Sequence, residues 1–393
     1  MSTGNEPEET PIGPMQVGSV AHGGHCVARF EGRVIFVRHA LPGESVMVRV
    51  TDASHKNFWR GDAVEILQAS PERTEPPCPV AVPAGCGGCD FQHVTATGQR
   101  RLKGGVIREQ LAHLAGIVWE GEVEAVGPLT GWRTRTRFLV DRQGSAPKVG
   151  MRAHRSHALI PLPARGCLIA DEKTPSPAEL DRIAAQTGAE EIRVVVPVDG
   201  EPRVITSREQ GAELVVEHCA SRDHLVRADG FWQVHPQAAS TLTEAVLQLL
   251  QPARGESALD LYCGVGLFAG ALSDQGCTVV GVEQVSRSVQ LARRNVPKGR
   301  FIAAPLARAL RQLPPRVDLI VLDPPRTGAG AQVVTHLAGL GARAIAYVAC
   351  DPAALARDLK TFAQQGYRAE LIRAFDLFPM THHVECVALL VRD

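Results

Sequence analysis

The sequence predicts an α/β protein of three parts: a small N-terminal β-barrel, a central α+β domain and a C-terminal domain built on a parallel sheet. From Val17 to about Ser70, short β-like runs alternate with Gly and Pro-Gly turns, a pattern typical of small barrels. From about Gly230, helix-like stretches alternate with short apolar runs, which predicts a doubly wound sheet covered by helices. The 393 residues, 45% hydrophobic, are enough to bury two or three such cores.

The first two segments are an N-terminal tail and the barrel. Residues 1–14, "MSTGNEPEETPIGP", are acidic and rich in Pro and Gly, which predicts a disordered tail. They lack the layout of a signal peptide, and no apolar run is long enough to cross a bilayer, so we expect a cytoplasmic protein without membrane contact. The barrel is expected over residues 15–72, and "SPERTEPPCP" reads as a linker.

The central domain is expected over residues 73–229, with a helix in "TGQRRLKGGVIREQLAHLAG" and strands in "WRTRTRFLVD", "KVGMRAHRSHALIPL" and "EIRVVVPVDG". If the first of these runs is a strand, Arg133, Arg135 and Arg137 share one face and can bind backbone phosphates. Residues 17–170 hold 19 Lys/Arg against 13 Asp/Glu in a chain of net charge +0. This excess suits a polyanionic partner, and ordinary solvated surface charge is the alternative.

Four of the ten cysteines are candidates for metal binding. In a reducing cytoplasm, clustered cysteines are more often metal ligands or catalysts than disulfides. Cys78, Cys86 and Cys89 lie within twelve residues, and Cys167 follows in "LPARGCLIADE". We assign His93 to a structural role, and five other cysteines to packing: Cys26, Cys219, Cys263, Cys277 and Cys386.

A nucleotide site is predicted in the last domain, residues 230–393. "LDLYCGVGLFAGAL" reads as a strand, a glycine turn and a helix, in which Gly264 and Gly266 permit a tight turn and leave room for a ligand. With Ala269 the spacing matches the Rossmann-like GxGxxA fingerprint, so an NAD enzyme is one possibility. Glu283 ends the next strand, where a carboxylate can accept the ribose hydroxyls of NAD or of S-adenosylmethionine.

The motif "VLDPPR" favours the second cofactor. An Asp at the end of a strand followed by two prolines, here Asp323, is a pattern of S-adenosylmethionine-dependent methyltransferases that act on planar nitrogen heterocycles. In addition, no second domain resembling a hydride-acceptor site follows. We therefore favour a methyltransferase over a dehydrogenase.

Taken in order, the motifs resemble those of the uracil-5 RNA methyltransferase family, whose members methylate carbon 5 of a uridine in ribosomal or transfer RNA. The likeness covers nearly the whole chain. The N-terminal "VGSVAHGG…ALPGE" resembles the family's RNA-binding TRAM barrel, which is OB-like. The other motifs are "CGGCDFQHV", "GFWQVHP", "LDLYCGVG", "GVE", "LDPPRTG", "YVACDP" and "FDLFPMTHHVE".

The resemblance implies two catalytic residues. Cys350 matches the family's nucleophile, a thiolate that adds to carbon 6 of uracil so that carbon 5 can take the methyl group. Glu385 matches the general base that removes the proton from carbon 5. Taken alone, each has a structural alternative: a buried cysteine and a partly exposed strand carboxylate.

The resemblance also implies an S-adenosylmethionine site. Tyr262 and Glu283 match cofactor contacts, Gln233 matches a residue near cofactor and substrate, and Asp323 is expected near the cofactor's reactive end. Arg326 is a candidate for an RNA phosphate contact. The sequence departs from the family pattern at four positions: Leu267, where an Asn often contacts the cofactor, His235, Ala349 and Asp351.

For the metal and the partner, the resemblance implies a [4Fe-4S] cluster on Cys78, Cys86, Cys89 and Cys167, with zinc as the alternative. The loop after Cys78 is longer than in the family. A TRAM-like barrel together with these cysteines favours 23S ribosomal RNA as the substrate, and uridine 54 of transfer RNA is the alternative. We expect a monomer. A non-catalytic RNA-binding or ribosome-assembly factor is the alternative of another class, disfavoured by the intact Cys350 and Glu385.

Overall fold

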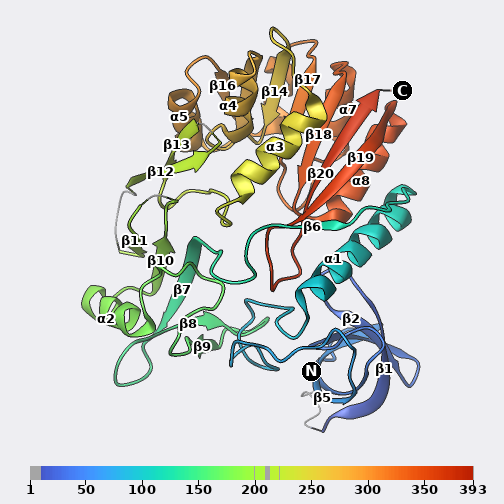
Figure 1. Ribbon diagram of the computed structural model, residues 1–393, viewed down its shortest axis with the longest axis vertical. Coiled ribbons are helices and arrows are strands. Elements are labelled where there is room, and N and C mark those ends of the chain that lie inside the picture. Colours follow the sequence, from blue (N-terminus) through green and yellow to red (C-terminus); the bar gives the residue numbers. More distant parts are fainter. Residues whose placement is uncertain (1–9, 199, 209–212, 221, 393) are drawn as a thin grey trace, which may run out of the picture.

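The computed structural model describes residues 10–198, 200–208, 213–220 and 222–392. Figure 1 shows three lobes: the N-terminal barrel and the central domain lie side by side, and the large α/β domain lies above both. Helix α1 (Ala96–Gln110) runs from the barrel toward the α/β domain. Within the described part of the chain, no helix combines the length and hydrophobicity that crossing a bilayer requires.

Five strands close the barrel in the order β1-β2-β3-β5-β4. They are β1 (Ile12–Val20), β2 (Cys26–Phe30), β3 (Arg33–Arg38), β4 (Ser45–Asp52) and β5 (Phe58–Gln68). Alternate side chains such as Ile35, Val37, Val46 and Val48 point inward and are fully buried. The small β-barrel predicted from the sequence is confirmed.

The predicted tail, residues 1–14, is too long at its end. Strand β1 begins at Ile12, which pairs with Val48 and packs against the barrel core. An apolar residue next to an open strand edge gains both hydrogen bonds and burial, which the composition of the segment does not reveal. The rest of that prediction, over residues 1–9, lies outside the described residues.

The central domain is a five-stranded sheet in the order β11-β10-β7-β8-β9. Its strands are β7 (Arg135–Asp141), β8 (Lys148–Arg152), β9 (Leu159–Pro161), β10 (Glu191–Val195) and β11 (Arg203–Thr206). Helix α2 (Pro177–Thr187) packs on the sheet through Leu180. Ser176 caps its first turn by accepting from the Glu179 amide, and Gly188, with φ +66°, ends it.

The α/β domain is an eight-stranded sheet in the order β16-β15-β14-β17-β18-β20-β19-β6. Its parallel strands are β14 (Ser257–Leu261), β15 (Thr278–Glu283), β16 (Arg300–Ala303), β17 (Leu319–Leu322) and β18 (Ala344–Ala349). β20 (Glu385–Arg392) pairs antiparallel with both β18 and β19 (Tyr367–Asp376). The parallel sheet agrees with the prediction, and an antiparallel pair of strands extends it.

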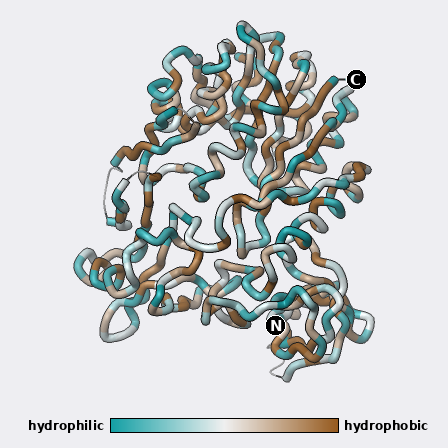
Figure 2. The backbone as a smooth tube through the Cα atoms, viewed as in Figure 1, coloured by the Kyte–Doolittle hydropathy of each residue, from teal (hydrophilic) through white to brown (hydrophobic). Residues whose placement is uncertain are grey.

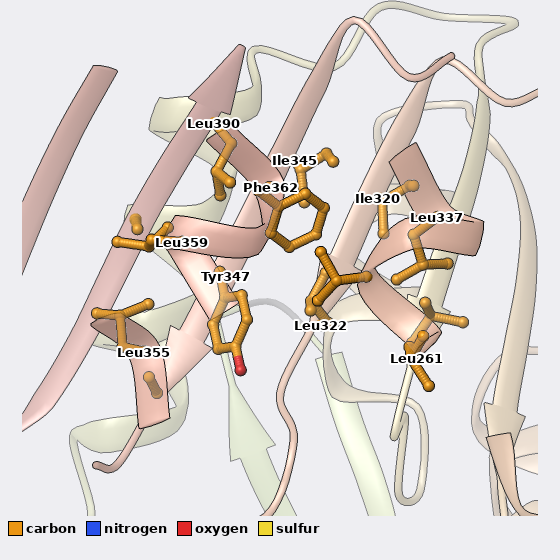
Figure 3. Packing of buried hydrophobic residues seen from close by; sticks show 14 of the residues in the cluster. Leu261, Ile320, Leu322, Leu337, Ile345, Tyr347, Leu355, Leu359, Phe362 and Leu390 are labelled. Atoms are coloured by element: carbon orange, nitrogen blue, oxygen red, sulfur yellow. The ribbon is translucent and has the colours of Figure 1, made fainter. Parts of the chain in front are cut away.

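Helices cover both faces of this sheet. They are α3 (Ala238–Leu250), α4 (Leu267–Asp274), α5 (Ser286–Asn295), α6 (Leu306–Ala309), α7 (Ala331–Gly339) and α8 (Pro352–Gln364). Figure 3 shows Tyr347 of β18 beside Leu355, Leu359 and Phe362 of α8. In Figure 2 the hydrophobic colour follows the strands, and the hydrophilic colour lies mainly on the loops and helices around them. Burial on both faces explains the almost uninterrupted apolar strands.

Two pieces of the predicted central segment, 73–229, pack outside the central sheet: the first between the barrel and the α/β domain, the second on the α/β domain. One contains α1, a π-helical turn η1 (Leu111–Ala115) and β6 (Val123–Ala125), which pairs in parallel with β19. The other is a hairpin of β12 (Leu214–Cys219) and β13 (Arg222–Arg227), whose Val215 and Val226 join the core under α3 and α4. A local pattern predicts a strand but not the sheet that the strand joins.

Candidate active site

The carboxyl ends of the parallel strands meet at one edge of the sheet, where open α/β sheets bind ligands. The residues predicted for the site follow these ends. Tyr262, Gly264 and Gly266 follow β14, Glu283 ends β15, Asp323 follows β17 and Cys350 follows β18. The fold therefore brings together groups that are up to 88 positions apart in the sequence.

Cys350 and Glu385 lie next to each other because of strand register. Ala349 of β18 pairs with Cys386 of β20, and the next residues at that end are Cys350 and Glu385. The Glu385 carboxyl is buried, and its Oε2 has no hydrogen-bond partner among the described residues. Burial, and then the nearby Asp323 carboxyl, raises the pKa of Glu385 well above its ordinary value.

The Cys350 thiol faces a cavity. Burial raises its pKa to about 12, with further contributions from Glu385 and Asp323, whereas Arg326 lowers it. The cavity measures about 550 Å³ including its open mouth, and it lies between the barrel and the α/β domain. The residues that line it include His22, Gly23, Gly24, Phe91, Lys103, Arg326, Cys350, His382 and His383. The thiol is thus partly exposed and reachable from outside.

The glycine turn adopts the tight geometry that its sequence predicts. Gly264 and Gly266 have φ of +52° and +93°, angles that favour glycine. A Cβ placed on Gly264 would meet no protein atom within 4 Å, so the space in front of the turn is open. The Glu283 carboxylate lies at this turn, where it accepts from the Gly264 amide at 3.3 Å and from the Val285 amide at 2.7 Å.

Asp260 is a site residue that the sequence reasoning missed. Its carboxyl is fully buried in β14, Oδ2 accepts from the Ala269 amide at 2.7 Å, and Oδ1 has no partner among the described residues. Burial first, and then the Asp323 and Glu283 carboxyls, raise its pKa to about 7, against the hydrogen bond from Ala269, which lowers it. Burial likewise raises the pKa of Asp323 to about 7. The signal was present, because an Asp interrupts the apolar run "ALDL".

The loop that contains Arg326 is fixed by hydrogen bonds to helix α8. Asp358 of α8 accepts from the Ala329 amide at 2.6 Å and from the Tyr347 hydroxyl at 2.6 Å. Arg326 itself lies on the cavity wall, with Nη2 3.2 Å from His383 Nε2. Its positive charge lowers the pKa of both Cys350 and Glu385.

Other predicted positions have mixed outcomes. Gln233 is half-buried in the loop before α3, and the next carbonyl, of Val234, accepts from the Thr134 amide. Leu267 is buried in the core at the start of α4, and the His235 ring stacks with that of Trp132 at 5.9 Å. His93 is buried, with its ring 5.8 Å from that of His39, which agrees with a structural role.

The three predicted arginines alternate with the buried Trp132, Thr134, Thr136 and Phe138 and so share one face, as expected, but Arg135 is already occupied by protein partners. Arg135 donates to Glu217 at 2.8 Å and to the carbonyls of Ala228 and Gly230, so its charge is used inside the protein. Arg137 forms an ion pair with Glu191. Arg133 precedes the strand and donates to the Arg135 carbonyl. A buried guanidinium must be satisfied by protein groups, which an alternation pattern cannot show.

The four cysteines line one cavity in the central domain. Cys78, Cys86, Cys89 and Cys167 surround about 600 Å³ of largely apolar space. Burial has the largest effect on the thiols of Cys86, Cys89 and Cys167 and raises their pKa values. Neighbouring cysteines of the set raise these pKa values further. Among the described residues, no three His, Cys, Asp or Glu side chains are arranged as a single-ion site. Arg133 and Arg137 also line this cavity.

The fold and the site define an S-adenosylmethionine-dependent methyltransferase with an added OB-like barrel. The TRAM domain family model matches residues 15–64, and the tRNA (Uracil-5-)-methyltransferase model matches residues 314–393. An uncharacterized RNA methyltransferase of Streptomyces avermitilis is 47% identical, over 96% of this chain and 97% of that protein. The 23S rRNA (uracil(1939)-C(5))-methyltransferase RlmD of Pseudomonas entomophila is 34% identical, over 98% of this chain and 96% of that protein.

One solved structure shares the fold over the whole length. The Pyrococcus abyssi tRNA (uracil-54, C5)-methyltransferase, in complex with S-adenosyl-L-homocysteine, superposes with a TM-score of 0.73 at 24% identity, over 96% of this chain and 99% of that chain. The 34% identity to the RlmD enzyme over nearly the full length shows that the chain belongs to the uracil-5 RNA methyltransferase family, which confirms the resemblance read from its motifs.

Proposed function

We propose that this enzyme converts a uridine of 23S ribosomal RNA to 5-methyluridine, with Cys350 as the nucleophile and Glu385 as the base. The observation that carries the proposal is the pair itself: a thiol and a carboxyl on adjacent strand ends, beside a cavity that opens to the surface. The choice of 23S RNA is supported by relatives with that name in Pseudomonas and Shewanella, which are 34% and 30% identical over nearly their full length.

The chemistry needs a covalent bond to the base. The Cys350 thiolate adds to carbon 6 of uracil, which makes carbon 5 electron-rich enough to take a methyl group. S-adenosylmethionine supplies that methyl as an electrophile on a cationic sulfur. Glu385 then removes the proton from carbon 5, the electron pair re-forms the ring double bond, and the carbon 6–sulfur bond breaks to release the thiolate. The target base must leave its stack to reach the thiol.

The residues fit such a cofactor. Tyr262, Gly264 and Gly266 form a backbone turn that is open in front of Gly264, and Glu283 offers a carboxylate beside it to ribose hydroxyls. Asp323 and Glu385 bury carboxyls whose pKa values are raised, so a nearby cation favours their ionised forms. Gln233 is proposed to border both cofactor and substrate.

Trapping tests this function. RNA that contains 5-fluorouridine should link covalently to the wild-type enzyme in the presence of S-adenosylmethionine, because fluorine cannot leave as a proton. Cys350→Ala should form no adduct, and Cys386→Ala, which changes the neighbouring buried thiol, should keep it. Mapping the 5-methyluridine lost from total RNA after gene deletion separates 23S RNA from transfer RNA. No adduct with any cellular RNA would favour a non-catalytic binding protein.

We further infer that Cys78, Cys86, Cys89 and Cys167 hold a [4Fe-4S] cluster. Four thiols on the wall of one largely apolar cavity match the four thiolate ligands that such a cluster needs. Protein purified without oxygen should contain iron and absorb as a brown solution. Cys89→Ala should lose the iron, whereas Cys277→Ala, which changes a cysteine outside this cavity, should keep it. Stoichiometric zinc with no iron would reverse the choice.

A further inference from the structure

One turn of the barrel reaches the catalytic site. It joins β1 to β2 over residues 21–25 and is closed by two hydrogen bonds, from the Ala21 amide to the His25 carbonyl at 2.7 Å and from the Gly24 amide to the Ala21 carbonyl at 3.1 Å. Three of its residues, His22, Gly23 and Gly24, line the same cavity as Cys350. The barrel is therefore one wall of the pocket in which the target base must lie.

Two contacts lock this turn onto the α/β domain. His22 Nε2 lies 2.8 Å from Asp351 Oδ2, and Asp351 directly follows the nucleophile. On the other side, a Cβ on Gly24 would lie 2.5 Å from His382 Cβ, so the backbone of the turn touches the loop that leads to Glu385. The turn thus lies between the segment of the nucleophile and the segment of the base.

Asp351 links His22 to the nucleophile. Its Oδ1 accepts from the Ala354 amide at 2.8 Å and caps helix α8, which leaves Oδ2 for His22. The charge of Asp351 opposes ionisation of the thiol, in addition to the larger effects of burial, Glu385 and Asp323. His22 faces Asp351, Arg357 and Glu109, and its hydrogen bond to Asp351 raises its pKa. A protonated His22 therefore offsets the carboxylate beside the thiol.

We propose that His22 is a positioning residue of the catalytic site: through Asp351 it fixes the backbone next to Cys350 and neutralises a negative charge there, so that the docked barrel sets the reactivity of the nucleophile. The inference rests on the proposed function only for the role of Cys350. The barrel then has a second function besides RNA binding, because Cys350 becomes fully reactive only when the turn of residues 21–25 is docked on Asp351.

A double-mutant cycle tests the proposal on the full-length protein. The rate at which iodoacetamide alkylates Cys350 is followed by mass spectrometry of its peptide, from pH 6 to pH 9, without RNA. His22→Gln should slow alkylation about two- to tenfold at pH 6.5, tenfold being one unit of thiol pKa, and the difference should shrink toward pH 9 as His22 loses its proton. Asp351→Asn, which keeps the helix cap, should speed alkylation, and adding His22→Gln to it should change the rate less than about twofold.

Two results would overturn the proposal: no effect of His22→Gln at any pH, or an equal effect of it with and without Asp351→Asn. Because alkylation needs no methyl transfer, this outcome is independent of the trapping experiment with 5-fluorouridine. If trapping fails while the cycle shows coupling, the proposed function is wrong and the link between His22 and Cys350 stands.

A glycine pair tests the docking separately. Gly24 and Gly32 have φ of +81° and +79°, so alanine strains both turns alike, but a Cβ on Gly32 meets nothing within 4 Å. Gly24→Ala should reduce RNA methylation about tenfold or more and make Cys350 alkylation as slow as in His22→Gln, whereas Gly32→Ala should stay within about twofold of the wild type. Equal behaviour of the two variants would show that contact with His382 is irrelevant.

Discussion

At the scale of single residues, the catalytic group is short of positive charge. Glu385, Asp323 and Asp260 are carboxyls whose pKa values are raised mainly by burial, and the Cys350 thiol is raised to about 12. Arg326 is the cation that lowers the pKa of both Glu385 and Cys350. Carboxyl and thiol groups with raised pKa values are typical of sites that exchange protons with a substrate.

The first prediction concerns Glu385. Glu385→Gln should still form the bond between Cys350 and uracil and still accept a methyl group, but it should not eliminate the product. Methylated RNA containing ordinary uridine should therefore stay attached to the protein, and turnover should fall about 10² to 10⁴-fold. A denaturing gel with a radiolabelled methyl group measures the adduct.

The double variant Cys350→Ala/Glu385→Gln serves as the control and should show no labelled protein. Release of free methylated RNA by Glu385→Gln at the wild-type rate would exclude Glu385 as the base.

The second prediction concerns Asp260 and pH. Its pKa is about 7 in the folded state against 3.8 for the ordinary carboxyl, so the folded protein holds this proton more tightly, and folding loses stability as pH rises through that window. Asp260→Asn is neutral throughout. Relative to the wild type, its free energy of unfolding should rise by about 2 to 3 kcal/mol from pH 5 to pH 8, as measured by urea denaturation.

Asp318 provides the matched comparison. Its pKa is lowered by hydrogen bonds from Ser257, so it is ionised at both pH values. The stability difference between Asp318→Asn and the wild type should not change from pH 5 to pH 8. If the stability difference between Asp260→Asn and the wild type is also the same at pH 5 and pH 8, the Asp260 carboxyl does not hold the inferred proton.

At this scale the sequence predicted which residue types meet at the candidate site. It could not predict which charged side chains already have partners inside the protein. Cys350 and Glu385 follow from motifs, because the chemistry fixes their types. Arg135 shows the limit: its partners Glu217, Ala228 and Gly230 lie 82 to 95 positions away, and only the tertiary fold brings them near.

At the scale of elements, helix α1 is clamped to the end of β19. Lys103 is fully buried, and its Nζ lies 2.5 Å from Asp376 Oδ1 and 3.0 Å from the Phe378 carbonyl. This is the start of the loop that leads to His382 and Glu385. A buried lysine with these two acceptors orders the loop and joins a helix of the predicted central segment to the catalytic sheet.

The third prediction follows from this pair. Lys103→Met leaves the Asp376 carboxylate buried without its cation and should lower the free energy of unfolding by about 3 to 5 kcal/mol, measured in urea. Hydrogen exchange of residues 377–384 should become faster. The double variant Lys103→Met/Asp376→Asn removes the unpaired charge and should regain most of the loss. A change below about 1 kcal/mol in Lys103→Met would mean that the pair is not a structural clamp.

Element types were predictable, whereas their partners were not. The alternation of apolar runs and helices after Gly230 predicted the parallel sheet because each strand is buried on both faces. The three residues of β6 are too few to carry a pattern, and the partner of this strand, β19, is about 250 positions away. The domain boundary at residue 229 therefore remains a prediction. Residues 96–125 and 214–227, which lie before that boundary, pack at least in part with the α/β domain.

At the scale of the whole molecule, the cysteine cavity and the catalytic site are joined by backbone. Asp90, which follows Cys89, donates its amide to the Met380 carbonyl at 2.9 Å, and Phe91 does the same. The segment with the proposed cluster ligands therefore supports the loop before Glu385. The glycine turn after β14 has no such connection among the contacts described above.

The fourth prediction is that iron removal acts on one side of the site only. A chelated, anaerobically prepared protein should show faster hydrogen exchange at residues 378–383, because the support from Asp90 and Phe91 loosens. Its affinity for S-adenosylmethionine, measured by calorimetry, should stay within about twofold of that of the iron-loaded protein. A tenfold loss of cofactor affinity, or unchanged exchange in this loop, would contradict the proposed division.

The position of β20 in the sheet has a consequence for biosynthesis. This strand is later in the chain than every other strand described, yet it lies between β18 and β19, and β19 in turn separates it from β6. While a ribosome is still translating the codons for residues 367–392, the nascent polypeptide exposes the unpaired edges of β6 and β18 together with their apolar side chains. Until β19 and β20 emerge, the growing chain needs protection from aggregation. Translation of a truncated mRNA would yield an aggregation-prone, protease-sensitive product instead of a smaller active enzyme.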